Sequence, residues 1–403
     1  MDLPDINEQM KNLVRKTSFF DFKKAVFNKS EYCVNKRGVF VKIKDQEILL
    51  EKDPVLYRLL DIRNKGFKVT NHLVVEPTME CNLKCSFCFT HNQPDSFDLT
   101  EFKKEIRKYK NRLVSISGGE PTLYKELPEL IKLIAKNNIP LLATNGLLLA
   151  DEGYVKELKA CGLKHVTFAF NGFSEKTEKA INGKMLLETK LKAIDNLSKN
   201  GFTFLLSMLL VRGVNEAEIE KLIQLALKYP ENIREVRIRV ESEIGKNKQN
   251  SPYFLSEVLT MFEQQIGISK KAVLRELHFK KIVKKLLLNK IVQKPCGFSF
   301  FICLNRGTLK ALSEVDSPII LKDFLLKAGS FLINKTTNKK KKELWFHRQP
   351  FLKISLRRWP GKETIDKYHH YENCGSRYIY GHKAGLPVCY ANFLQYSAKY
   401  QSV

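Results

Sequence analysis

Three cysteines stand close together near the end of the first quarter of the chain: Cys81, Cys85 and Cys88. Thiolates on one short loop can bind either zinc or an iron–sulfur cluster. Three ligands would hold three corners of a cubane [4Fe–4S] cluster and leave its fourth iron open to a chelating molecule. A structural zinc site needs a fourth ligand, which His91 could supply. The triplet therefore predicts a metal centre and, taken alone, leaves both kinds open.

Two further segments with ligand-binding chemistry come directly after apolar stretches. The first is Gly118-Gly119-Glu120-Pro121, where two glycines allow backbone to approach a ligand and a carboxylate can bind an ammonium group. The second is Thr144-Asn145-Gly146. On its own, the glycine pair indicates no more than a turn, so its meaning depends on the cysteine loop.

Alternating strands and helices must position these residues. The predicted strands are Leu73–Thr78, Leu113–Ser117, Pro140–Thr144, His165–Phe170, Phe202–Val211 and Glu235–Val240. The predicted helices between them are Leu99–Lys110, Lys125–Lys136, Asp151–Ala160, Leu186–Ser198 and Ala217–Lys228, the last with a capping box of Asn215 and Glu218. Short apolar strands in βα units predict a parallel sheet, whose functional loops lie at the carboxyl ends of the strands.

The cysteine triplet, the Gly-Gly-Glu-Pro segment, the Thr-Asn-Gly strand end and the βα order together resemble the radical S-adenosylmethionine (radical SAM) enzymes over about residues 71–245. The resemblance implies a partial (β/α)6 barrel. It also implies that S-adenosylmethionine chelates the open iron and that one electron cleaves it to a 5′-deoxyadenosyl radical, which abstracts hydrogen from a substrate.

The same resemblance assigns roles to individual residues. Cys81, Cys85 and Cys88 would ligate the cluster, and Phe87 would pack near the adenine. The remaining cofactor contacts would come from Gly118, Gly119, Glu120, Pro121 and Asn145.

One departure concerns the fourth strand end. Many relatives have Ser-x-Asp-Gly there, whereas this chain has Ala169-Phe170-Asn171-Gly172, which puts the usual ribose contacts in doubt. Asn171 could hydrogen-bond to the cofactor or act only as a turn residue. Ser207 on the fifth strand is another candidate for contact with the cofactor. The alternative is that it is a buried serine that hydrogen-bonds to backbone.

Four cysteines of the C-terminal quarter predict a second metal site: Cys296, Cys303, Cys374 and Cys389. Together they could hold an auxiliary [4Fe–4S] cluster, which is favoured over a zinc ion. The alternative is that they are buried structural cysteines without a metal. This region resembles the subgroup of the 7,8-dihydropterin methyltransferases and tetraether lipid synthases. Its Cys-rich N-terminal knuckle is absent here, so the subgroup's substrates are not carried over.

The predicted organisation has four parts. They are an N-terminal hairpin and helix (1–70), the barrel core (71–245), a basic helical segment (246–294) and a small cysteine-containing C-terminal domain (295–403). Within the core, Arg237 and Arg239 alternate along one strand and point to one face, where they could bind a carboxylate or phosphate if that face is the barrel interior.

Composition sets the remaining expectations. The chain has 69 Lys and Arg against 43 Asp and Glu, a formal net charge of +26, which suits an anionic partner but equally suits solvated lysine faces. No run of about 18 apolar residues and no signal segment occurs, and the nine cysteines are an odd number in a chain without an export signal. We therefore expect a cytoplasmic protein without a transmembrane segment.

The leading hypothesis is a radical SAM enzyme that modifies an unactivated C–H position of a small-molecule, lipid or peptide substrate, using a one-electron donor such as flavodoxin or ferredoxin. Peptide-maturing and RNA-modifying radical SAM enzymes are alternatives within that class. A non-catalytic iron–sulfur or zinc protein that binds nucleic acid is the alternative outside it, and the Gly-Gly-Glu-Pro segment argues against it.

Overall fold

The computed structural model describes nine stretches of the chain: residues 32–43, 46–60, 72–88, 97–240, 253–288, 297–305, 307–315, 351–358 and 376–381. His91, Cys296, Cys374 and Cys389 lie outside these stretches. No helix in them is both long enough and apolar enough to cross a membrane.

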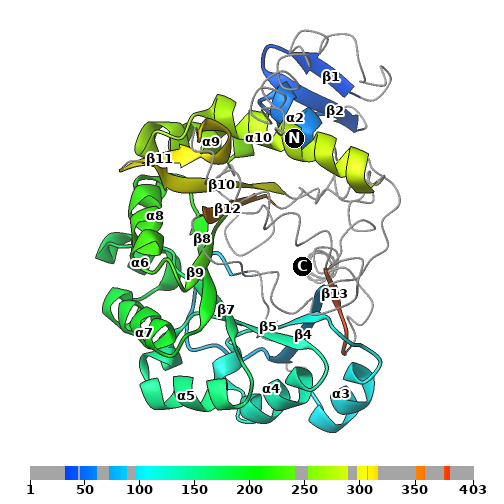
Figure 1. Ribbon diagram of the computed structural model, residues 1–403, viewed down its shortest axis with the longest axis vertical. Helices are drawn as coiled ribbons and strands as arrows, with labels where there is room; N and C mark the ends of the chain where they lie inside the picture. Colours follow the sequence, from blue (N-terminus) through cyan, green and yellow to red (C-terminus); the bar gives the residue numbers. More distant parts are fainter. Residues whose placement is uncertain are drawn as a thin grey trace, which may run out of the picture.

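A ten-stranded sheet forms the centre of the molecule (Figure 1). Its strand order is β11-β10-β12-β9-β8-β7-β6-β5-β4-β13. The six central strands are β4 (His72–Thr78), β5 (Leu113–Gly118), β6 (Ile139–Thr144), β7 (His165–Ala169), β8 (Thr203–Leu210) and β9 (Ile233–Val240). They pair in parallel and in sequence order, which confirms the predicted α/β class and all six predicted strands. The described sheet is open, with β11 and β13 at its ends.

Helices cover the outer side of this curved sheet (Figure 1). They are α3 (Leu99–Ile106), α4 (Leu127–Ala135), α5 (Glu152–Ala160), α6 (Glu175–Asn182), α7 (Leu187–Lys199) and α8 (Ile219–Lys228). In α8, for example, Ile219, Leu222 and Ile223 recur at helical spacing and are fully buried. They belong to the same apolar core as Val236 and Ile238 of β9.

Because side chains alternate along a strand, the inner face of the sheet carries the other half of each strand. That half includes polar side chains: His72 and Ser115 form a hydrogen bond of 2.7 Å, and His165 and Thr203 one of 2.6 Å. The outer face, in contrast, belongs to the apolar core.

The N-terminal hairpin and the two helices that follow the core were also predicted. The N-terminal hairpin of β2 (Gly38–Ile43) and β3 (Gln46–Glu51), with α2 (Pro54–Leu60), is confirmed, and β1 (Tyr32–Asn35) adds a third strand. The two predicted basic helices are α9 (Leu255–Ile266) and α10 (Lys270–Leu288).

Strands from the C-terminal part join both ends of the central sheet. Strand β12 (Phe351–Arg357) pairs in parallel with β9 and antiparallel with β10 (Gly297–Asn305), which pairs with β11 (Thr308–Ala311). At the other end, β13 (Ser376–Tyr378) pairs in parallel with β4. The described residues of the predicted C-terminal domain thus share one sheet with the barrel core.

Two details differ from the sequence prediction. Helix α6 was not predicted. The capping box at Asn215 and Glu218 was wrong: a short 3₁₀ helix, Glu216–Glu218, precedes α8, and Asn215 makes no side-chain cap. Instead, the Asn215 amide donates to the carbonyls of Asn171 and Leu209, and Glu218 accepts from the backbone of Phe173. Both side chains therefore join the loop after β7 to the rest of the sheet.

Candidate active site

The three cysteines of the first motif lie on one loop that leaves the carboxyl end of β4. Cys81 is exposed, and Cys85 and Cys88 are partly buried. Burial and then the neighbouring thiolates of Cys88 and Cys81 raise the pKa of Cys85 to about 11. The structure thus places the three predicted ligands on one short loop.

The donor set of the loop consists of three thiols. Among the described residues, no three His, Cys, Asp and Glu side chains are grouped so that they could hold one metal ion. His91, which a zinc site on this loop would use as its fourth ligand, lies outside the described residues. Three thiols are the donor set that a [4Fe–4S] cluster with one open iron requires.

The Gly-Gly-Glu segment packs directly against the backbone that enters the cysteine loop. The Gly119 amide donates to the Thr78 carbonyl at 3.0 Å, and the Glu120 amide donates to the Glu80 carbonyl at 2.7 Å. A Cβ on Gly119 would lie 2.2 Å from the Glu80 oxygen, and one on Gly118 would lie 2.3 Å from the Thr78 oxygen. The two glycines are therefore needed for backbone-to-backbone contact beside the cysteines.

Replacing Gly119 with alanine should displace the start of the cysteine loop, because the Cβ would meet backbone atoms that cannot rotate away. We expect loss of most of the iron at the first site, measured by iron and sulfide analysis after anaerobic reconstitution. Gly153→Ala on α5 is the matched control, since its Cβ would meet only the Asp151 side chain, at 3.1 Å. Equal iron in wild type and Gly119→Ala would contradict this account.

Glu120 is almost completely buried, with 1% of its surface exposed. Its Oε1 accepts from the hydroxyls of Thr122 at 2.6 Å and Thr144 at 2.7 Å. Its Oε2 accepts from the backbone N–H of Asn145 at 2.7 Å. Burial raises the pKa of Glu120 despite these hydrogen bonds. Oε2 accepts fewer hydrogen bonds than Oε1 and is the atom with capacity left for an ammonium donor.

Asn145 ties the end of the third strand to the cysteine loop. The side-chain nitrogen of Asn145 donates to Asn82 Oδ1 at 2.7 Å, and its side-chain oxygen accepts from the backbone N–H of Leu147. Pro121 is buried at the start of a 3₁₀ turn, and Phe87 is partly buried beside Cys88. The structure thus brings the residues predicted after β5 and β6 to the same edge of the sheet as the cysteines.

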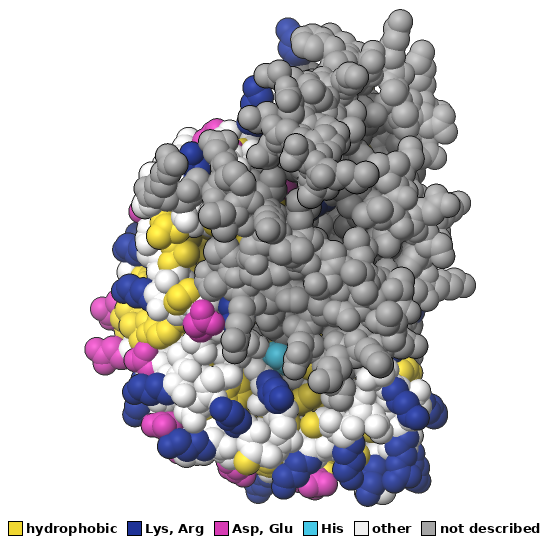
Figure 2. Space-filling model, in the orientation of Figure 1, with side chains coloured by type: hydrophobic (Ala, Val, Ile, Leu, Met, Phe, Trp, Pro, Cys, Tyr) yellow, Lys and Arg dark blue, Asp and Glu magenta, His cyan; other side chains and the backbone are white. Residues whose placement is uncertain are grey.

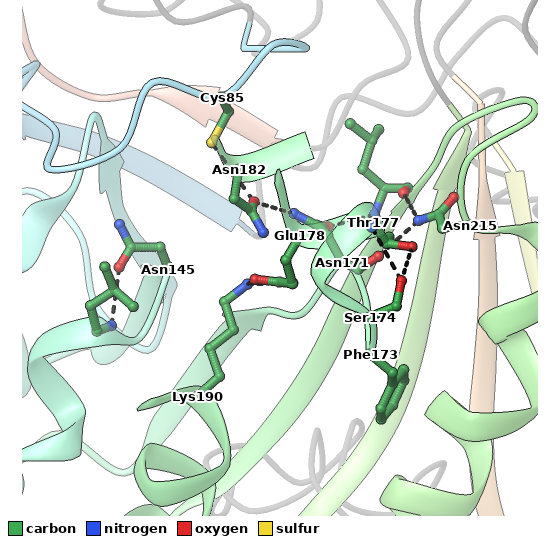
Figure 3. A network of polar contacts seen from close by, with 12 residues as sticks. Cys85, Asn145, Asn171, Phe173, Ser174, Thr177, Glu178, Asn182, Lys190 and Asn215 are labelled. Carbon is green, nitrogen blue, oxygen red and sulfur yellow. Dashed lines mark hydrogen bonds and ion pairs between the residues drawn. The ribbon is translucent and has the colours of Figure 1, made fainter. Parts of the chain in front are cut away.

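Helix α6, which sequence reasoning missed, holds the loop from the other side (Figure 3). The Ser86 hydroxyl donates to the Ala180 carbonyl at 2.7 Å, and the Ser86 amide donates to the Ile181 carbonyl at 3.1 Å. The Cys85 thiol lies 3.9 Å from Asn182 Oδ1. Signals for this helix were present: Ser174 caps its start and Gly183, with φ of 77°, ends it.

Asn171, predicted as a cofactor contact, uses both ends of its side chain within the protein (Figure 3). Its nitrogen donates to Asn182 Oδ1 at 3.1 Å, and its oxygen accepts from the Leu209 amide at 2.9 Å. Its clearest contribution in the structure is to position Asn182, which contacts Cys85.

A buried ion pair lies behind the cysteine loop. Lys190 Nζ is 3.3 Å from Glu178 Oε1, and the two side chains are 1% and 0% exposed (Figure 3). Burial lowers the pKa of Lys190, and Glu178 and Cys85 oppose this effect. Lys190 thus places a positive charge where thiolates would carry negative charge.

The inner face of the sheet carries Ser207, Arg237 and Arg239, because the outer face of β8 and β9 belongs to the apolar core. Ser207 pairs in register with Arg237. Its hydroxyl is buried and forms no hydrogen bond with a described residue.

Of the four C-terminal cysteines, the structure describes Cys303. It lies near the end of β10, buried, between Lys310 of β11 and Phe351 of β12. Burial and the charge of Glu276 raise its pKa.

The face shown in Figure 2 bears on the meaning of the high net charge. On the described part of the face in Figure 2, Lys and Arg side chains are spread over the lower part of the molecule, with Asp and Glu among them. This pattern fits the solvated lysine faces expected as one origin of the high net charge.

Comparison with known proteins supports the interpretation of the core. Residues 75–226 match the sequence model of the radical SAM superfamily. A 7,8-dihydro-6-hydroxymethylpterin dimethyltransferase of Methanocaldococcus jannaschii is 35% identical over 43% of this chain and 36% of its own length. A probable GTP 3′,8-cyclase of Pyrococcus abyssi is 33% identical over 47% of this chain and 62% of its own length.

This chain therefore spans about one third and three fifths of those two relatives. Among solved structures, Streptococcus suis SuiB bound to precursor peptide SuiA is 18% identical with a TM-score of 0.44, covering 56% of this chain and 53% of that one. A similarity this low supports no argument about function.

Proposed function

We infer that residues 75–226, which belong to the radical SAM superfamily, make this protein an enzyme that reductively cleaves S-adenosylmethionine. The observation that carries the inference is one loop with three cysteines that is hydrogen-bonded to the Gly-Gly-Glu backbone, to Asn145 and to the end of α6. When bound, a [4Fe–4S] cluster supplies the electron that splits the cofactor, and the resulting 5′-deoxyadenosyl radical abstracts hydrogen from the substrate.

The residues of this chain would divide the work of binding. Cys81, Cys85 and Cys88 would hold three irons, because they are the only described thiols on that loop. Glu120 Oε2 would accept a hydrogen bond from the methionine ammonium group, and the rest of its network fixes the carboxylate in place.

For the other residues predicted to contact the cofactor, we propose only that they lie close enough to support its binding. Gly118, Gly119 and Pro121 shape the strand end beside Glu120, and Phe87 lies next to Cys88. Asn145 and Asn171 support the loop, and Ser207 faces the interior with a free hydroxyl.

We propose a small molecule as the substrate class, ahead of a lipid or peptide, because both relatives are named for small heterocycles, a pterin and GTP. The electron would come from a one-electron donor such as flavodoxin or ferredoxin.

The decisive experiment is anaerobic reconstitution of the full chain with iron and sulfide, followed by dithionite and S-adenosylmethionine. Formation of 5′-deoxyadenosine supports the proposal. A colourless protein that binds zinc and RNA and forms no 5′-deoxyadenosine would instead support the nucleic-acid-binding alternative.

A second cluster remains part of the proposal, with a constraint from β10. Cys296 is bonded to Gly297, the first residue of β10, whereas Cys303 is six residues farther along the same strand. At about 3.4 Å per residue, Gly297 and Cys303 are roughly 20 Å apart. A cubane spans only a few ångströms, so Cys296 and Cys303 do not ligate the same cluster in this arrangement, and we propose Cys296, Cys374 and Cys389 as its ligands.

Iron analysis of single serine variants tests this assignment. We expect Cys303→Ser to retain the iron of the wild type, because Cys303 is buried inside a strand ladder. We expect Cys296→Ser to lose about four irons per chain, the content of one cluster. Loss of iron in both variants would contradict the constraint, and no loss in either would remove the second cluster.

A further inference from the structure

Three neighbouring strands present a row of polar side chains on the inner face of the sheet. Arg237 of β9 stands in register with Ser207 of β8 on one side and with Ser355 of β12 on the other. Residues in register on adjacent strands point to the same face. The next row toward the carboxyl end of β9 pairs Arg239 with Arg357.

Three polar atoms of these rows are buried and form no hydrogen bond with a described residue. Two of them are the hydroxyls of Ser207, which is 2% exposed, and of Ser355, which is 0% exposed. The third is the Nε atom of Arg239. Buried polar groups in folded proteins nearly always have a hydrogen-bond partner, so three such atoms on one face point to a partner that the described residues do not supply.

The charges around these atoms specify the kind of ligand. Glu235 is the carboxylate within the group, and it pairs with Arg237 at 2.9 Å and Lys353 at 2.7 Å. Arg239 and Arg357 form no ion pair with a described residue. With Arg237, Arg239, Lys353 and Arg357 around the single carboxylate of Glu235, this face carries an excess of positive charge, which suits an anionic ligand.

The position of the rows relates them to the candidate active site. Asn171 accepts a hydrogen bond from the Leu209 amide, two residues beyond Ser207, and it contacts Asn182, which lies against Cys85. A group bound beside the arginines would face the same interior into which the cysteine loop opens.

We propose that Ser207, Arg237, Arg239 and Ser355 form an oxyanion subsite that binds a phosphate or carboxylate group of the substrate. The serine hydroxyls donate to the oxyanion, and Arg239 supplies charge and a further N–H donor. The assignment of the oxyanion to the substrate rests on the proposed function, whereas the existence of the subsite does not.

Calorimetric titration of the reconstituted full chain with inorganic pyrophosphate, and separately with citrate as a carboxylate probe, tests the subsite. We expect at least one probe to bind in the presence of saturating S-adenosylmethionine. Hydrogen bonds to charged groups contribute about 1.5–3 kcal/mol, so Arg239→Met and Ser355→Ala should each weaken binding about tenfold or more. Arg107→Met, an exposed arginine at the end of α3, is the matched control and should bind normally.

A second variant guards against a simple folding defect. Ser355→Asp places a carboxylate beside the arginines, so it should abolish probe binding while raising the melting temperature of the protein. The subsite is overturned if neither probe binds, or if all variants bind as the wild type does. Displacement of the probe by S-adenosylmethionine would assign the oxyanion position to the methionine carboxylate and overturn the substrate assignment. Formation of 5′-deoxyadenosine without substrate reports on the proposed function separately.

Discussion

Replacing Cys85 with alanine should abolish 5′-deoxyadenosine formation and remove about four irons per chain. Cys85 is the middle cysteine of the triplet on the loop. With two thiolates left, the loop has too few ligands to hold a cubane against loss to solvent. Iron and sulfide analysis, visible absorption of the cluster and chromatographic detection of 5′-deoxyadenosine measure the effect.

Cys33→Ala is the matched control for this variant. Cys33 is exposed on β1 of the N-terminal sheet, and its removal should change neither the iron content nor cofactor cleavage. Full cofactor cleavage by Cys85→Ala would refute the assignment of the triplet and, with it, the proposed function.

Replacing Lys190 with methionine should lower the free energy of unfolding by about 3–5 kcal/mol, since it leaves the fully buried Glu178 without its cation. Because Glu178 belongs to α6, whose last turn binds the cysteine loop, the same change should reduce incorporation of the first cluster. Urea unfolding of the reconstituted protein and iron analysis measure the two effects.

The double variant Lys190→Met, Glu178→Leu separates charge from packing. Removing both charges should recover much of the lost stability, because no uncompensated ion is left inside. Lys156→Met on α5 breaks an exposed pair with Glu152 and should not change the unfolding midpoint measurably. An unchanged midpoint in Lys190→Met would show that the pair does not stabilise this region.

The local patterns that predicted the strands and most helices were strong for a physical reason. Strands covered by helices on one side repeat apolar residues such as Leu206 and Met208, and their bounds follow from that repeat. Helix α6 was missed because its buried residues include Glu178 and Asn182, so it has little apolar periodicity. These two buried side chains accept hydrogen bonds from residues outside the helix: Glu178 from Lys190 and Asn182 from Asn171.

The cysteine spacing and the glycine pair predicted, without any structure, a metal centre and the edge of the sheet where these residues lie, and the resemblance to radical SAM enzymes predicted its chemistry. The sequence could not show that Gly119 is needed against the Glu80 backbone, or that α6 closes the loop at Ser86. Nor could it place Ser355 beside Arg237, 118 residues earlier in the chain, or bury Cys303 in a strand between β11 and β12. Local patterns depend on neighbours a few residues apart, whereas strand pairing and buried polar contacts depend on segments that only folding brings together.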